Sequence, residues 1–317
     1  MARVRLSPGE RLFQEERKAS FRREEFSFIH TGIIDEDGEM WTTTELDEAN
    51  ISQVYNQYRV KHGIPFPYEI AGIRAHYGLS AAKMSQILGF GINQYRMYED
   101  GEVPGISNAR TILAAREKDV FLSFLEASKC DLGESEYLRI KKKIDAVTGN
   151  YPAIQPPSEY SGYRSLSIDK IANVIGIIIS KMGETFITKM NKLLFYVDFI
   201  HYKNHGYGIT GVTYHAWQYG PVPESWGSLY GSLPGIIMEE YVYPSGQSGI
   251  RLNATEELSS NSLSDDEIET VKRVCELFSS MTAGEISETS HREKGWIDNQ
   301  AKRSAISYQE AFSLNFD

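Results

Sequence analysis

Three polar side chains, Asn93, Gln94 and Arg96, follow a glycine-containing turn and share one side of a short helical pattern. Amide side chains of this kind pair bidentately with adenine in the DNA major groove, and arginine pairs with guanine or phosphate. Their position at the start of a second short helix is typical of a helix-turn-helix, whose recognition helix enters the groove by its N-terminal part. A helical hairpin with a polar, solvated face is the alternative interpretation.

The residues that must position these side chains lie in the stretch MSQILGFGINQYRMYEDGEVP, from Met84 to Pro104. Its first helix is capped by Ser80 and ends at Gly89. The second helix is expected to bury Ile92, Tyr95 and Tyr98, which are spaced three residues apart. Phosphate contacts are expected from Lys83 and Arg74 near the helix starts.

A second group with possible chemistry is the set of histidines His201, His205 and His215. The first two are four residues apart, which places both imidazoles on one helical face and would make half a metal site. Lys203 lies between them and would oppose a cation, and no HExxH glutamate is present. We therefore expect no metal, no cofactor and no enzymatic activity; an enzyme using these histidines is the alternative.

Aromatic residues are crowded into the segment that follows. Large aromatic side chains dominate the energetics of protein interfaces, and they also fill cores. Both interpretations stay open for the candidate binding residues Tyr202, Tyr214, Trp217, Tyr219 and Trp226.

Composition bounds the class of protein. The chain has 317 residues and a net charge of −10: residues 1–150 hold 20 Lys and Arg against 23 Asp and Glu, and residues 151–317 hold 13 against 20. The C-terminal half would repel DNA phosphates and would suit a basic partner. Two distant cysteines, Cys130 and Cys275, fit a reducing cytoplasm, and neither a signal peptide nor a membrane-spanning run is expected.

The patterns predict a mainly α fold with small β elements in four segments. Residues 1–63 form a small α+β unit with strands at 25–34 and 39–43, joined at Asp37-Gly38, and a helix that ends at Gly63. Residues 64–129 are an all-α helix-turn-helix domain. Residues 130–166, rich in charge and then in proline and glycine, are expected to be a linker. Residues 167–317 are expected to be mostly α with a short β-hairpin.

The stretch LSAAKMSQILGFGINQYRMYEDGEVP resembles the helix-turn-helix of MqsA-type antitoxins, and the resemblance covers about residues 45–129. In that family an asparagine and an arginine of the second helix read the operator. Asn93 fits the first position, whereas Met97 stands at the second, with Arg96 one residue earlier. The resemblance therefore adds Met97 to the expected DNA-binding set. No cysteine precedes Cys130, so the zinc module of many family members is not expected.

The stretch KMNKLLFYVDFIHYKNHGYGITGVTYHAWQYGPVPESWGSLY resembles the Panacea, or SocA-like, domain, and the resemblance covers about residues 167–313. It implies a neutralising domain that binds a toxin protein directly. Together the two resemblances imply a cytoplasmic type II antitoxin that binds its toxin through the C-terminal domain. They also imply a homodimer that binds operator DNA and represses its own operon. A stand-alone helix-turn-helix regulator with a C-terminal sensor domain is the alternative.

Overall fold

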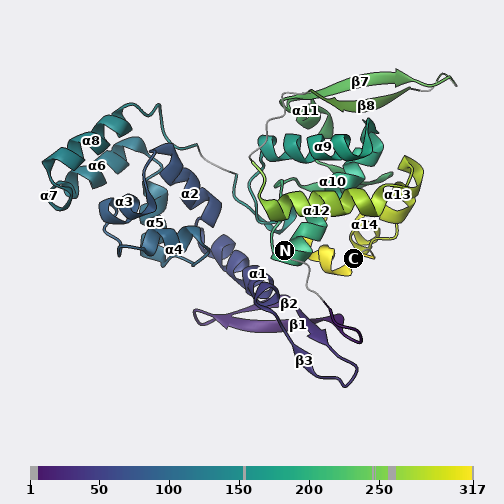
Figure 1. Ribbon diagram of the computed structural model, residues 1–317, viewed down its shortest axis with the longest axis horizontal. Helices are drawn as coiled ribbons and strands as arrows, with labels where there is room; N and C mark the ends of the chain where they lie inside the picture. The colour runs from purple at the N-terminus through teal and green to yellow at the C-terminus, as the bar shows by residue number, and fades with distance from the viewer. Residues whose placement is uncertain (1–5, 153–154, 245, 247, 256–261, 316–317) are drawn as a thin grey trace. The chain divides into compact units, whose positions relative to one another are not determined.

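The computed structural model describes residues 6–152, 155–244, 246, 248–255 and 262–315 (Figure 1). They form a mainly helical fold with small antiparallel sheets, as the sequence predicts. Contacts divide the chain into two compact units: residues Tyr55–Ile154, and residues Met1–Val54 together with Gln155–Asp317. No helix in the described part of the chain is long and apolar enough to cross a bilayer.

The chain begins with a long β-ribbon. β1 (Arg11–Phe21) pairs antiparallel with β2 (Glu24–Ile34), and the two-residue strand β3 (Met40–Trp41) pairs with the end of β2. The β2–β3 turn has Gly38 at φ +85°, which confirms the expected Asp37-Gly38 turn.

Strand β1 was not predicted, because its turn carries no Asn-Gly or Asp-Gly signal. Arg22 and Arg23 occupy the turn with φ values of 49° and 69°, which non-glycine residues rarely adopt.

Helix α1 (Thr44–His62) covers β2 through two side-chain amides. Asn50 accepts a hydrogen bond from the Thr31 amide at 2.9 Å and donates one to the Thr31 carbonyl at 3.0 Å. Gln53 makes the same pair of bonds with Ile29, at 3.1 and 2.9 Å. The two amides therefore satisfy backbone groups of β2 that pair with no other strand among the described residues.

In its described residues, 55–152, the unit formed by residues 55–154 is all-α. After the end of α1 it contains α2 (Pro67–His76), α3 (Ala81–Ile87), α4 (Gln94–Glu99), α5 (Ile106–Ala114), α6 (Lys118–Ala127), α7 (Lys129–Leu132) and α8 (Glu134–Asp145). One hydrophobic cluster joins α2 to α6 and α8.

The expectation of a linker from residue 130 is wrong over its first part, where α7 and α8 lie. Tyr137, Ile140 and Ile144 of α8 are buried in the same cluster as residues of α3 and α4. They recur at helical spacing beneath the charged run from Arg139 to Lys143, which forms the solvated face of an amphipathic helix.

The C-terminal part is built around one buried helix, α10 (Ile187–His205), in which every residue from Met190 to Tyr202 is buried. It packs against α9 (Ile168–Met182), α12 (Asp265–Phe278) and α13 (Ala283–Ser290) (Figure 1). Around it lie β4 (Thr185–Phe186), β5 (Tyr214–Trp217), β6 (Gly220–Pro223), α11 (Trp226–Gly231), β7 (Ile236–Val242), β8 (Ser248–Ala254), α14 (Lys294–Asn299) and the 3-10 helices η1 (Glu159–Ser161) and η2 (Tyr308–Ser313). The predicted β-hairpin is the β7–β8 pair.

Candidate DNA-binding and protein-binding surfaces

Helix α4, the expected recognition helix, is held in place by Tyr95. The Tyr95 side chain is fully buried, and its hydroxyl donates to the Ile70 carbonyl at 2.8 Å. Its backbone amide donates to the Ser85 hydroxyl of α3 at 3.0 Å. Tyr98, one turn later, is also buried, and its hydroxyl accepts a hydrogen bond from Asn108 at 2.7 Å. The two tyrosines therefore fix which side of α4 faces outward.

The predicted DNA-reading residues lie on the outward side of α4 and at Asn93, the residue before it. Asn93 and Arg96 are exposed, Met97 is 49% exposed, and Gln94 is half-buried with its amide 3.2 Å from a Glu102 oxygen. This ridge is open to a partner.

The prediction that Ile92 is buried is wrong, because this side chain is 82% exposed. Ile92 precedes the first residue of α4, so helical spacing does not apply to it. It lies next to Asn93, the residue before the helix, and thus extends the exposed ridge by one apolar side chain.

The two predicted phosphate-binding side chains are both held in ion pairs. Arg74 donates from Nε to Glu99 at 2.6 Å and from Nη1 to the Leu79 carbonyl at 3.1 Å. Lys83 lies 3.3 Å from Glu136. Arg74 thus links α2 to the end of α4 and helps to fix the orientation of α4. The phosphate contacts of Arg74 and Lys83 stay predictions.

The helical unit of residues 55–154 differs in net charge from residues 1–150 as a whole. Residues 55–154 hold 13 Lys and Arg against 11 Asp and Glu, a balance of +2, whereas the rest of the chain holds 20 against 32, a balance of −12. The helical unit therefore carries a positive balance, which favours an approach to phosphates.

In the C-terminal part, the Ile209-Thr210-Gly211 turn is attached to α10 by one buried carboxylate. Asp198 Oδ1 accepts the backbone amides of Ile209 and Thr210 at 2.8 and 2.9 Å. Its Oδ2 accepts the Thr210 hydroxyl and the Tyr214 hydroxyl, the latter at 2.7 Å. Burial raises the pKa of Asp198, and these four donors oppose the rise by stabilising the charged form. The Ile209-Thr210-Gly211 turn, which belongs to the stretch that resembles the Panacea domain, thus has a structural role.

Gly211 is expected to be the least replaceable residue of this turn. Its φ is +75°, and a Cβ there would lie 2.3 Å from the Ser165 carbonyl oxygen. Gly183 has the same φ of +75° with no atom within 4 Å of such a Cβ. Gly183, with ψ −168°, lies in a region almost restricted to glycine, so Gly183→Ala should cost only the backbone strain of about 1–3 kcal/mol. Gly211→Ala should cost about 2 kcal/mol more from the clash. Urea unfolding of both full-length variants measures the difference, and equal losses would contradict it.

The five predicted aromatic binding residues divide into two groups. Tyr202 and Tyr214 are fully buried, so the prediction that they form a binding surface is wrong; they pack in the core around α10. Trp217, the last residue of β5, is 45% exposed, and Tyr219 in the turn to β6 is 67% exposed. Trp226 is half-buried. Tyr214 and Trp217 lie three residues apart on β5, so their side chains point to opposite faces of the strand. Aromatic composition alone does not show which of the two is buried.

Trp217 is held in place by contacts with Trp296 and Arg303. The Trp296 indole donates to the Trp217 carbonyl at 2.8 Å, and the Arg303 guanidinium lies 5.0 Å from the Trp217 ring centroid. An ordered, exposed aromatic of this kind can bind a partner at a small entropic cost.

Beneath the turn between β5 and β6 lies a lysine that the sequence analysis did not single out. Lys192 of α10 is 1% exposed, and burial lowers the pKa of its amine to about 8. Gly220 lies directly against it, since a Cβ at Gly220 would come within 2.7 Å of the Lys192 Cε. Helical periodicity places Lys192 opposite the apolar face of Met190, Leu194 and Val197, so its burial follows only from α10 being surrounded on all sides.

The histidines do not come together as one set of ligands. His201 is buried with Nδ1 3.0 Å from the Thr270 hydroxyl, and His205 stacks on it at 4.1 Å. Burial lowers the pKa of His205 to about 4, so the ring is neutral at pH 7. His215 bonds instead to the Arg303 carbonyl at 3.1 Å. Within the described ranges, no group of three His, Cys, Asp or Glu side chains is placed to hold a metal ion.

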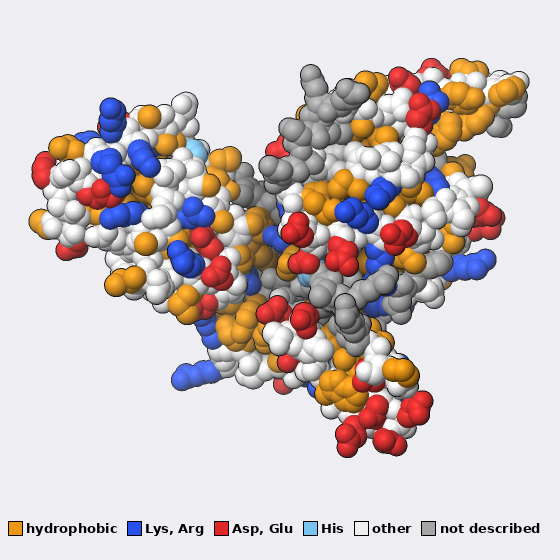
Figure 2. All heavy atoms as spheres, in the orientation of Figure 1, with side chains coloured by type: hydrophobic (Ala, Val, Ile, Leu, Met, Phe, Trp, Pro, Cys, Tyr) orange, Lys and Arg blue, Asp and Glu red, His pale blue; other side chains and the backbone are white. Residues whose placement is uncertain are grey.

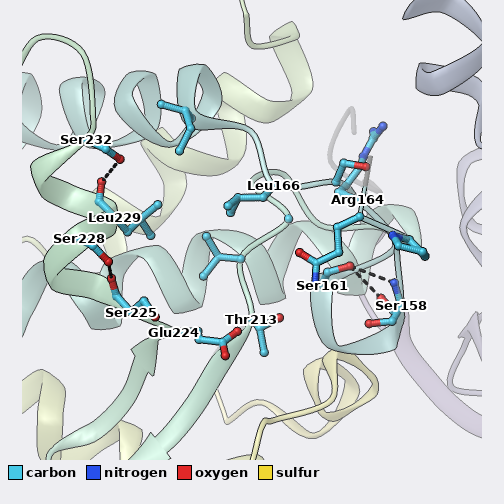
Figure 3. Close-up of a pocket in the computed structure, with 16 residues that line it drawn as sticks. Ser158, Ser161, Arg164, Leu166, Thr213, Glu224, Ser225, Ser228, Leu229 and Ser232 are labelled. Carbon is cyan, nitrogen blue, oxygen red and sulfur yellow. Dashed lines mark hydrogen bonds between the residues drawn. The ribbon is translucent and has the colours of Figure 1, made fainter. Parts of the chain in front are cut away.

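A cavity of about 510 Å³ lies between the segment before α9 and the β6–α11 region (Figure 3). Leu166, Val212 and Leu229 supply apolar surface, and Arg164 and Glu224 are charged residues of the lining. Its polar lining also includes Thr213 and the serines Ser158, Ser161, Ser165, Ser225, Ser228 and Ser232. Ser225 has a φ of +52°, a strained value for a non-glycine residue. A cavity of this size is sufficient for a small ligand.

Residues 190–297 match the family model described as Antitoxin SocA-like, Panacea domain. The match covers about a third of the chain and runs from α10 to α14. It supports the C-terminal resemblance and indicates a toxin–antitoxin or related role. The comparison with curated proteins found no match, and the comparison with solved structures found none either.

Proposed function

We propose that this chain is the antitoxin of a type II toxin–antitoxin pair and neutralises its toxin by direct binding through the C-terminal domain. The observation that carries the proposal is the match of residues 190–297 to an antitoxin-like domain. The exposed Trp217 and Tyr219 on an ordered turn support a protein-binding role for that domain. Its excess of acidic residues favours a basic toxin.

The proposal includes DNA binding by the helical unit. The exposed ridge from Ile92 to Met97, held outward by Tyr95 and Tyr98, supports α4 as the recognition helix. In this proposal two copies of the chain bind a palindromic operator whose half-sites lie roughly 34–36 Å apart, one turn of the duplex. The chain then represses its own operon while it holds the toxin, and it acts as a stoichiometric binder, with no catalytic turnover.

A second candidate is a helix-turn-helix regulator whose C-terminal domain senses a ligand. The cavity lined by Leu166, Val212 and Leu229 favours it, because it is large enough for a small molecule. The antitoxin candidate requires a toxin encoded by the adjacent gene. The sensor candidate requires a small molecule that changes operator affinity.

The test is a titration of the purified product of the adjacent gene with the full-length chain. Stoichiometric neutralisation predicts that toxin activity falls linearly and ends at a fixed molar ratio near one chain per toxin. Neutralisation at a small fraction of that ratio would indicate an enzyme, and no neutralisation at any ratio would leave the sensor candidate.

A further inference from the structure

The sheet β4–β8–β7 has an open outer edge at β7. The Thr255 amide donates to the Gly235 carbonyl at 2.8 Å, and these two residues continue the β7–β8 register, in which Ile236 pairs with Ala254. Hydrogen-bonded and non-bonded pairs alternate along an antiparallel ladder. Residues 237, 239 and 241 therefore bond to β8.

The backbone groups of the alternate residues face away from β8. Met238, Glu240 and Val242 direct their amides and carbonyls to the outer edge, and no strand in the described part of the chain pairs with them. The Ile236 amide, which also faces this way, bonds to the Leu233 carbonyl at 3.4 Å. The edge formed by these three alternate residues is long enough to pair with an added strand.

The sheet presents an exposed aromatic face next to this edge. Phe186 of β4 lies 5.7 Å from Tyr241 and 5.5 Å from Tyr243, measured between ring centroids. The rings close over Gly249, where a Cβ would lie 3.4 Å from Phe186. Ile237 and Val242 are also exposed. Figure 2 shows hydrophobic side chains gathered over the β7–β8 hairpin beside acidic ones.

The charges of this surface favour a basic partner over a second copy of the chain. Glu239 and Glu240 are exposed on β7, and Glu184 lies beside β4. Arg251 is already paired with Glu184 and with Glu239, at 3.3 Å for the latter. Pairing of β7 with β7 of another copy would place these glutamates close to one another, and like charges on facing strands are destabilising.

We propose that the outer edge of β7 accepts an extended, lysine- or arginine-bearing segment of the toxin as a fourth strand. The backbone groups of Met238, Glu240 and Val242 pair with it, and Tyr241 and Tyr243 contact its side chains. This inference rests on the proposed antitoxin function and places the toxin on the edge of a sheet. It adds a surface that sequence reasoning missed, because β4 and β7 lie some fifty residues apart in the chain.

Hydrogen exchange at single-residue resolution tests the edge without any substitution. In the free chain the amides of residues 238, 240 and 242 should exchange faster than those of 237, 239 and 241. With the adjacent gene's product bound, the first set should slow by at least about tenfold. Binding of that protein with no slowing at these amides would overturn the edge while leaving the antitoxin function standing. A complete lack of binding would remove both.

Two substitutions at one position separate backbone from side chain. Glu240→Pro removes only an outward amide, a change that edge strands tolerate, and should weaken toxin binding at least about tenfold relative to Glu240→Ala. Equal affinities of the two full-length variants would overturn the pairing. Slowing of the same amides in the free chain as its concentration rises would assign the edge to a second copy instead.

Discussion

Asp198→Ala is expected to lower the free energy of unfolding by about 3–5 kcal/mol, the cost of breaking a buried charged network. The substitution leaves two backbone amides and the hydroxyls of Thr210 and Tyr214 without their acceptor in a fully buried site. Each unsatisfied buried donor costs about 1–3 kcal/mol, and partial relaxation reduces the sum. We expect the variant to lose toxin neutralisation because the turn from Ile209 to Gly211 is no longer attached to α10.

Urea unfolding of the full-length chain measures this effect, with Asp169→Ala as the matched control. Asp169 is an exposed carboxylate in the first turn of α9, so its removal should cost only about 0.3–1 kcal/mol through the helix dipole. A loss below about 1 kcal/mol for Asp198→Ala would mean that the carboxylate does not hold the turn.

The double variant Asn93→Ala, Arg96→Ala is expected to lose about 2–6 kcal/mol of operator binding, since each base contact contributes about 1–3 kcal/mol. Both side chains are exposed, Arg96 on α4 and Asn93 directly before it, while the buried Tyr95 and Tyr98 hold the helix in place. Their loss should therefore leave the fold unchanged. Replacement of Arg96 should also reduce the salt dependence of binding if its guanidinium contacts a phosphate.

A gel-shift titration at fixed salt measures the loss, and Arg139→Ala is the control. Arg139 is an exposed arginine of α8 paired with Glu136, outside the α4 ridge. It removes one positive charge from the same unit and should change operator affinity much less. Operator affinity of the double variant equal to that of Arg139→Ala would rule out α4 as the reading helix.

Local signals in the sequence predicted several helix ends correctly. Ser80 caps α3 by accepting the Lys83 amide at 3.3 Å. Ser264 and Thr282 each begin a capping box with the glutamate three residues later, a pattern of the same local kind. These signals are reliable because cap and helix are neighbours in the chain, so the interaction depends on few other residues.

The sequence predictions that failed depend on contacts distant in the sequence. Tyr202 and Tyr214 are buried because α10 is surrounded on all sides, which aromatic composition does not indicate. Phe186 meets Tyr241 only because β8 lies between their strands. The long strand β1 was missed because Arg22 and Arg23 make a turn that residue preferences disfavour. For the tyrosines and for Phe186, tertiary structure decides the outcome, whereas the β1–β2 turn is local and departs from residue preferences.

The central claim is that one chain binds a toxin through its C-terminal domain and DNA through α4, independently. The most direct measurement is calorimetric titration of the adjacent gene's product into the wild-type chain and into the Asn93→Ala, Arg96→Ala variant. The account predicts the same Kd and the same stoichiometry for both. Absence of binding to the wild-type chain, or loss of binding in the variant, would contradict it.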